Sequence, residues 1–356
     1  MSKRFLITLL TLFLFSILYG MLGIINEYIG KSLILVYILL PSLALTSGYF
    51  FSIESKHYKR IYLFVFSIMV STTLFIIISY FKTVGYFGTL DNAADYYGNR
   101  AIGSMWSIQD KIPATNLTLR LLIPLSIIPI IFLFNKDLSR KSMITSKALV
   151  LISFISTFPL TIQLGSRTSI VLLITISLFS YLFMGSFNFK KFLNLAMSFV
   201  SILLAYFLYY TDFLNIKTWW YTTTAYKRFS NQGLESSRTD AWFEVLEHFF
   251  QNPFGGREIS ININYVHNLW LDVVYDVGWI TGLILIIFTL MSISAIMRFY
   301  YSNYPIYLKL ILLLIFIGFL VFFMTEPIMA TNERDYFVLF CFFVGIVLGL
   351  NKRNVE

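Results

Sequence analysis

The sequence predicts an all-α polytopic membrane protein, with about ten transmembrane helices and both ends of the chain in the cytoplasm. Apolar residues make up 58% of its 356 positions, charged residues make up only 13%, and the mean hydropathy is +0.75. Soluble domains have roughly a quarter of their residues charged. This composition therefore excludes a soluble enzyme, a disordered chain and a collagen-like chain, and residues 1–356 are predicted to form one integral membrane domain.

Long apolar segments recur along the whole chain. A helix needs about 20 mainly apolar residues to cross the hydrocarbon core, because each residue adds about 1.5 Å. Ten segments reach or nearly reach this length, namely 5–25, 33–53, 61–81, 117–134, 148–165, 168–187, 192–211, 276–297, 309–325 and 336–350. The first imitates a signal peptide, but its apolar stretch is too long for one and no convincing cleavage site follows. We therefore expect it to remain as a span.

The distribution of cations predicts the orientation. Short cytoplasmic loops carry an excess of Lys and Arg. With the N-terminus inside, the cations in or beside inside segments are Lys3, Arg4, Lys56, Lys59, Arg60, Lys136, Arg140, Lys141, Lys147, Lys190, Lys191, Arg298, Lys309, Lys352 and Arg353. The short outside loops keep only Lys31, Arg167 and Arg334. The bias thus favours ten spans in a cytoplasmic membrane, with both termini inside.

Two long loops fall on the outer side in this topology. The first covers residues 82–116, and the second, larger one covers 212–275. Loops of this length in a compact protein are usually functional, so the second loop is the predicted active-site loop.

A helix is predicted early in the charged part of the second loop. Ser237-Arg-Thr-Asp240 has the form of a capping box, and Asn252-Pro253-Phe254-Gly255-Gly256 is a helix stop. Between them, an apolar stripe recurs at helical spacing through Trp242, Leu246, Phe249 and Phe250. The charges on its other faces exclude a span, so we expect an amphipathic helix along the membrane interface, with Arg238 in its first turn.

A second helix is predicted to begin at His267-Asn268. Asn268, Asp272 and Asp276 follow one another at four-residue spacing and share one face. Polar groups facing lipid are penalised, so this face should meet protein or a wet cavity. We expect the two acids to orient neighbours through hydrogen bonds rather than to act as a base. His267 lies nearer the mouth of such a cavity.

Four arginines are expected on the outer side. Arg167 follows Gly165-Ser166 in a tight turn between two spans, and Arg120 lies one turn into a span. Arg238 and Arg257 belong to the second loop. Guanidinium groups bind phosphate through two parallel hydrogen bonds and stay charged at any relevant pH. The competing interpretation is contact with lipid headgroups, which accounts for Arg120 and Arg257 most simply.

The order of these elements resembles the O-antigen polymerase and O-antigen ligase superfamily. The matching elements are Gly165–Arg167 between two spans, Arg238–Trp242, Asn252–Gly256, and His267-Asn268 opening a span. The resemblance covers about residues 148–297, and the rest agrees only in topology. It implies that a sugar chain is transferred from undecaprenyl diphosphate on the outer face of the cytoplasmic membrane.

The resemblance implies a metal-independent glycosyltransferase that polymerises oligosaccharide repeat units into O-antigen or capsular polysaccharide. Donor and acceptor would be undecaprenyl-diphosphate-linked oligosaccharides, with a chain-length regulator and a repeat-unit flippase as further partners and no nucleic acid. No cofactor or metal is expected, since no metal-ligand motif occurs. The expected catalytic residues are His267, Arg238 and Arg167. The expected substrate-binding residues are Arg120, Arg257, Asn268, Asp272 and Trp242.

Two alternatives remain open from the sequence. A ligase that passes finished polymer to the lipid A core would use the same donor. A transporter or flippase of lipid-linked oligosaccharide belongs to another class, but such proteins usually bury ionisable residues near the middle of the membrane. Here the spans are almost free of such residues and the charges gather on one side, which favours an enzyme.

Overall fold

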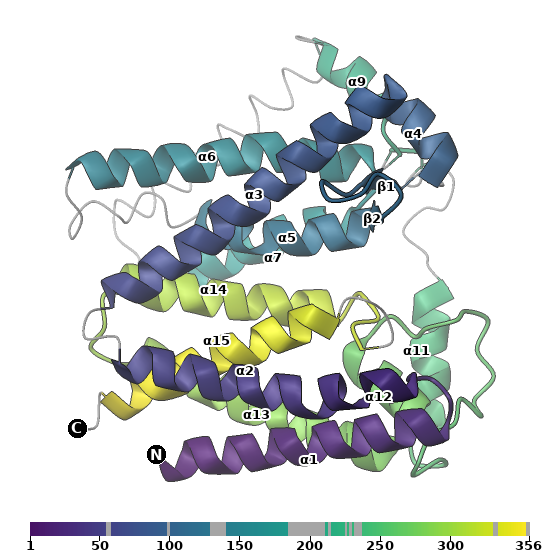
Figure 1. Cartoon of the computed structure of the whole chain (residues 1–356), viewed down its shortest axis with the longest axis vertical. Coiled ribbons are helices and arrows are strands. Elements are labelled where there is room, and N and C mark those ends of the chain that lie inside the picture. The colour runs from purple at the N-terminus through teal and green to yellow at the C-terminus, as the bar shows by residue number, and fades with distance from the viewer. Residues whose placement is uncertain are drawn as a thin grey trace. The chain divides into compact units, whose positions relative to one another are not determined.

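The computed structural model is almost entirely helical (Figure 1). It describes residues 1–54, 58–97, 100–128, 140–183, 211–212, 215–224, 226–227, 230, 237–329 and 334–353. The helices up to residue 127 are α1 (Lys3–Ile25), the short 3₁₀ helix η1 (Lys31–Leu33), α2 (Ile34–Glu54), α3 (Lys59–Phe87), α4 (Leu90–Tyr97) and α5 (Ala114–Ile127). Those that follow are α6 (Arg140–Gln163), α7 (Arg167–Phe183), α9 (Ile216–Thr222), α11 (Ser237–Glu247), α12 (Leu269–Val277), α13 (Trp279–Tyr300), α14 (Ile306–Phe323) and α15 (Arg334–Arg353).

Seven helices of the described residues are long and apolar enough to cross a membrane. They are α1, η1 with α2, α3, residues 144–163 of α6, α13, α14 and α15. Two of the other predicted spans correspond to the shorter apolar helices α5 and α7, and the predicted span 192–211 lies almost wholly outside the described residues. Large apolar side chains are exposed on these helices, for example Leu10 at 58% and Ile174 at 63%. Such a surface is favourable in lipid and costly in water.

The helices form two compact units. The first comprises residues 1–70, 122–150 and 235–356, and the second comprises 71–121 and 151–234. In the first unit α1, α2, α13 and α15 pack against one another (Figure 1). The apolar helix α14 is the most buried of the candidate spans, with 72% of its 18-residue apolar stretch buried.

Glycines allow α2 and α15 to approach closely. A Cβ atom on Gly48 would overlap the backbone carbonyl of Phe342, and one on Gly345 would overlap that of Leu45. Small residues at such positions let helix backbones come together in membranes, where packing rather than water exclusion drives association.

Gly345→Ala should therefore destabilise the first unit by about 1–3 kcal/mol, because the added methyl group forces the two backbones apart. Gly85→Ala is the matched control, since nothing lies within 4 Å of a Cβ at that helical position. Thermal unfolding of the purified protein in detergent measures both. Equal melting temperatures for the two variants would contradict this account of the α2–α15 contact.

The segment predicted as the first long loop, residues 82–116, contains regular secondary structure. Helix α3 continues to Phe87, α4 follows, and the strands β1 (Ala101–Gly103) and β2 (Lys111–Pro113) form an antiparallel pair. Ile102 faces Ile112 in this pair, and both are buried in an apolar cluster with Leu117, Leu160 and Leu164. The hairpin therefore helps to form the core of the second unit.

The predicted amphipathic helix exists as α11, and only part of its apolar stripe is buried. It begins at Ser237 as expected and ends at Glu247, five residues before Asn252. Ala241 and Val245 form its buried face against α12, with Trp242 and Phe249 partly buried beside them. Leu246 and Phe250 of the predicted stripe are exposed, at 53% and 72%. The buried face of α11 is the one that packs against α12. The periodicity of α11 alone does not reveal this contact.

Candidate active site

The polar end of the first unit is built around the short helix α12. Its N-cap is Asn268, whose side-chain oxygen accepts hydrogen bonds from the backbone N–H groups of Trp270 (3.2 Å) and Leu271 (3.3 Å). Asn268, Asp272 and Asp276 are all at least 93% buried, at 7%, 1% and 2% exposure. The prediction that this polar face meets protein is therefore confirmed.

Asp272 holds the segment in front of α12. Its carboxyl oxygens accept hydrogen bonds from the backbone N–H groups of Val266 (2.7 Å) and Asn268 (3.1 Å). The carbonyl of Val266 in turn accepts one from the indole N–H of Trp242 (2.8 Å). Both neighbours of His267 are thus fixed. These contacts agree with the prediction that Asp272 orients its neighbours through hydrogen bonds. Trp242 takes part in the same arrangement through its bond to Val266.

His267 itself has a left-handed backbone conformation, with φ of +59°. This region is unfavourable for residues other than Gly, with Asn, Asp and His among the better tolerated. Such a conformation persists only where the surroundings impose it, and it occurs preferentially at functional sites. Here the hydrogen bonds from Val266 and Asn268 to Asp272 hold the backbone on both sides of His267.

His267 and Arg238 meet at Glu326, three residues after the last residue of α14. The Glu326 side chain is 3% exposed, and one of its carboxylate oxygens lies 3.8 Å from His267 Nδ1 and 3.8 Å from an Nη atom of Arg238. The other Nη atom of Arg238 donates a hydrogen bond to the Thr325 carbonyl (2.6 Å). His267, Arg238 and Glu326 are far apart in the sequence but meet here. We call these three residues the Glu326 cluster.

Arg257 forms a second ion pair at the same end of the unit. Its Nε atom donates to Asp276 at 2.8 Å, and its guanidinium lies 4.2 Å from the ring centroid of Tyr28. Tyr265 and Tyr275 lie farther away, at 5.5 and 5.7 Å. Cation–π contacts of this kind stabilise a guanidinium that has lost part of its water.

The Asn252–Gly256 turn places Arg257 over Asp276. The N–H groups of Gly256 and Arg257 donate to the carbonyls of Asp276 and Tyr275, each at 3.1 Å. Gly255 has φ of +75°, and a Cβ atom there would overlap the backbone at the end of α12. The side chain of Asn26, at the end of α1, donates to the carbonyls of Phe254 and Asp276, both at 3.2 Å. The predicted helix stop is therefore also a docking element for α12.

Burial, followed by the charge on Asp276, raises the pKa of Asp272 to about 8. The folded protein then keeps a proton that the unfolded chain releases near the ordinary pKa of about 4. The stability that this proton contributes is complete below about pH 4 and is lost as the pH rises to about 8.

The melting temperature should consequently fall between pH 5 and pH 8, and Asp272→Asn should reduce this dependence because an amide cannot ionise. The variant should also be less stable at pH 5, since its NH₂ group faces a backbone donor. Asp240→Asn, at an exposed position of α11, is the control. An unchanged pH dependence in Asp272→Asn would mean that Asp272 is ionised in the folded protein.

Arg120 and Arg167 belong to the second unit. The turn between α6 and α7 is as tight as predicted, with φ of +78° at Gly165. The hydroxyls of Ser166 and Thr118 lie 2.5 Å apart, so this turn packs against the start of α5. Arg120 donates to the Asn116 side chain (3.2 Å) and lies 4.0 Å over the ring of Phe75. It also lines a cavity of about 460 Å³ together with Trp106.

Sequence reasoning did not identify Glu326, on which two predicted catalytic residues converge. The available signal is an acid immediately after the predicted span 309–325, in which Lys309 is the one charged residue, since ionisable residues near spans are usually functional. Its partners lie 88 and 59 positions away in the sequence, so local spacing cannot indicate them. The four arginines were expected to gather, and in the first unit Arg238 and Arg257 instead pair with separate acids, Glu326 and Asp276.

The seven long apolar helices and the lipid-compatible surface define an all-α, multi-pass membrane protein. No protein-family model matches the sequence, and no curated protein resembles it closely enough to count as a relative.

Proposed function

We propose that the protein is a lipid-dependent glycosyltransferase that polymerises undecaprenyl-diphosphate-linked repeat units into O-antigen or capsular polysaccharide. The observation that carries the proposal is the Glu326 cluster. A histidine and an arginine, the type of cation that binds phosphate through two hydrogen bonds, both lie 3.8 Å from one buried carboxylate. This combination is suited to transfer from a lipid diphosphate, in which a proton acceptor and a positive charge near the leaving group both help.

The roles follow from the chemistry of the transfer. With Nδ1 facing Glu326, the Nε2 atom on the opposite side of the His267 ring takes the proton of the acceptor hydroxyl. The acceptor oxygen forms the new bond to the anomeric carbon of the donor sugar. The bond between that carbon and the diphosphate breaks, and undecaprenyl diphosphate leaves with the electron pair.

Arginines stabilise the negative charge that the leaving group gains. In the first unit Arg238 has this role. Arg257, which pairs with Asp276 and lies near three tyrosine rings, is proposed as a second arginine that binds the diphosphate. Asn268, Asp272 and Trp242 act as positioning residues for His267. Arg167 and Arg120 lie in the second unit, and the phosphate-binding role expected for them from the sequence is proposed for that unit by itself. Trp106 is 76% exposed beside the Arg120 cavity and offers a ring for stacking on a sugar.

The two ends of the first unit support the proposed orientation. Met1, Lys3, Arg4, Arg298 and Lys352 line one cavity and therefore lie at one end. The opposite end of α1 reaches Asp276 through Asn26, so the basic end and the candidate site are separated by the length of the helices. The charge bias favours a cytoplasmic position for the basic end. The site then lies on the extracytoplasmic side, where flipped donors are exposed.

Deletion of the gene in its native host should leave lipid-linked single repeat units that are still made and exported. Those units should reach the final acceptor and give a product one repeat long, because only chain extension is lost. Gel separation of the surface glycan measures this directly. Restoration of long chains by the intact gene on a plasmid is the control.

The other candidates leave different products. Loss of a ligase would leave long chains on undecaprenyl diphosphate, and loss of a flippase would trap single units on the cytoplasmic side. Either pattern would contradict the proposal.

A further inference from the structure

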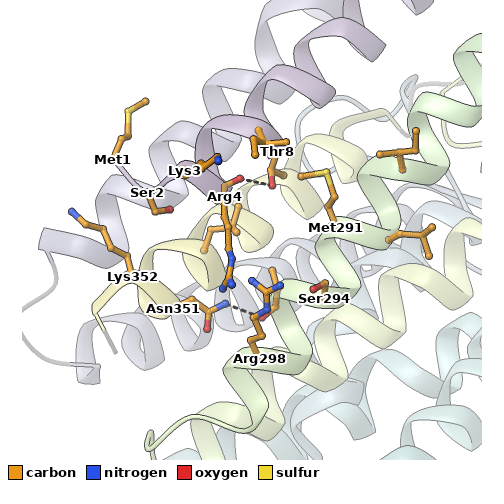
Figure 2. A pocket seen from close by; sticks show the side chains of 15 residues that line it. Met1, Ser2, Lys3, Arg4, Thr8, Met291, Ser294, Arg298, Asn351 and Lys352 are labelled. Atoms are coloured by element: carbon orange, nitrogen blue, oxygen red, sulfur yellow. Dashed lines mark hydrogen bonds between the residues drawn. The ribbon is translucent and has the colours of Figure 1, made fainter. Parts of the chain in front are cut away.

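A cavity of about 770 Å³ lies at the basic end of the first unit, remote from the Glu326 cluster. It is formed by the start of α1 and the ends of α13 and α15 (Figure 2). The polymerisation chemistry proposed above takes place at the other end of these helices and does not involve it.

The polar part of the cavity is strongly cationic. Lys3, Arg4, Arg298 and Lys352 line it, and the described residues that line it include no acid. Figure 2 shows the guanidinium groups of Arg4 and Arg298 pointing toward one another inside the cavity. Two like charges brought together repel each other, and an anion between them turns this repulsion into two charge-assisted contacts.

The remaining wall of the cavity is apolar and open to the outside. Ile7 on α1 and Ile287 and Leu290 on α13 line it and are 45%, 50% and 59% exposed. Asn351, near the cations, already donates a hydrogen bond to the Ala295 carbonyl (2.8 Å). A ligand that fits this surface has a negatively charged head and an apolar tail.

We propose that this cavity binds an anionic phospholipid, with its phosphodiester between Arg4 and Arg298 and an acyl chain along Ile7, Ile287 and Leu290. The positive-inside bias accounts for cations at this end. It does not account for a cavity of this size or for two guanidinium groups directed into it. Basic pockets between membrane helices on the cytoplasmic side are suited to acidic lipid headgroups.

The test compares lipid binding by the intact protein and by charge variants. In nanodiscs of phosphatidylcholine, added phosphatidylglycerol should raise the melting temperature in a saturable manner. Arg4→Gln with Arg298→Gln should weaken the apparent affinity by about fivefold for each cation removed. Arg60→Gln is the matched control, because Arg60 is an exposed cation at the start of α3 that does not line the cavity. Both substituted arginines are exposed, so the double variant should fold.

A second variant tests the apolar wall with all charges intact. Leu290→Trp should fill the groove and weaken phosphatidylglycerol binding while leaving the stability in phosphatidylcholine unchanged. Glycerol phosphate and inorganic phosphate, which have the head without the tail, should produce little shift. An equal effect of either soluble anion would make this a site for free phosphate. An equal loss in Arg60→Gln would show that only general surface charge is involved, and either outcome would overturn the proposal.

Discussion

His267→Asn should reduce polymer formation by about 10²–10⁴-fold, the loss typical of a missing general base, while the protein still folds. Asparagine is suited to this test because it accepts the left-handed backbone that His267 adopts, with φ of +59°. Alanine would combine the loss of the base with backbone strain. The Asp272 contacts to Val266 and Asn268 do not involve the imidazole, so they should persist in the variant.

The measurements for this variant are glycan chain length in cells, transfer rate with purified lipid-linked units, and melting temperature. His248→Asn is the matched control, because the His248 side chain is 31% exposed and its Nδ1 atom contacts only Glu244, one turn away, at 3.0 Å from the backbone carbonyl and 3.8 Å from the carboxylate. Normal long chains from His267→Asn would remove His267 from the chemistry. Glu326→Gln should lower the rate less, since a polar partner for the imidazole remains.

Arg238→Lys should nearly abolish polymer, because lysine keeps the charge but loses the planar fork. In the structure one Nη atom of Arg238 donates a hydrogen bond to the Thr325 carbonyl and the other lies beside the Glu326 carboxylate. A single ammonium group does not reproduce this geometry. Arg167→Lys should have a similar effect on polymer for the same chemical reason. Arg60→Lys, at an exposed position on α3, is the control for the substitution itself.

A double variant separates phosphate binding from structural pairing. Removing Arg238 alone leaves Glu326 as a buried charge with less compensation, which costs up to about 3 kcal/mol for a pair buried on one side. Arg238→Gln combined with Glu326→Gln removes both charges, so protein abundance in the membrane should recover. Polymer should not recover if Arg238 binds phosphate. Full recovery of long chains would show that pairing with Glu326 is the whole role of Arg238.

Much of the architecture can be predicted because it depends on local sequence. The length of an apolar run fixes a span, and the seven long helices lie where the hydropathy places them. The spacing of Asn268, Asp272 and Asp276 likewise predicts one buried polar face, which the structure confirms. The described part of α11 starts at Ser237, where the capping pattern predicts the start of a helix.

The features that were not predicted depend on pairing between distant segments. The strands β1 and β2 have three residues each, too few for an alternating pattern to stand out. The buried face of α11 depends on the shape of α12. Glu326 becomes part of the site only because the end of α14 lies beside residues 238 and 267, and no spacing rule relates those three positions.

The break between α12 and α13 has a consequence for the depth of the site in the bilayer. Helix α13 has 22 residues, a length of about 33 Å, which closely matches a hydrocarbon thickness of about 30 Å. Gly278 joins α12 to this helix and packs directly against Pro253. In the proposed orientation, the length of α13 therefore sets how far the Glu326 cluster lies from the cytoplasmic side of the bilayer. One helical turn inserted into α13 would lift the site by about 5.4 Å, away from a diphosphate held at the headgroups.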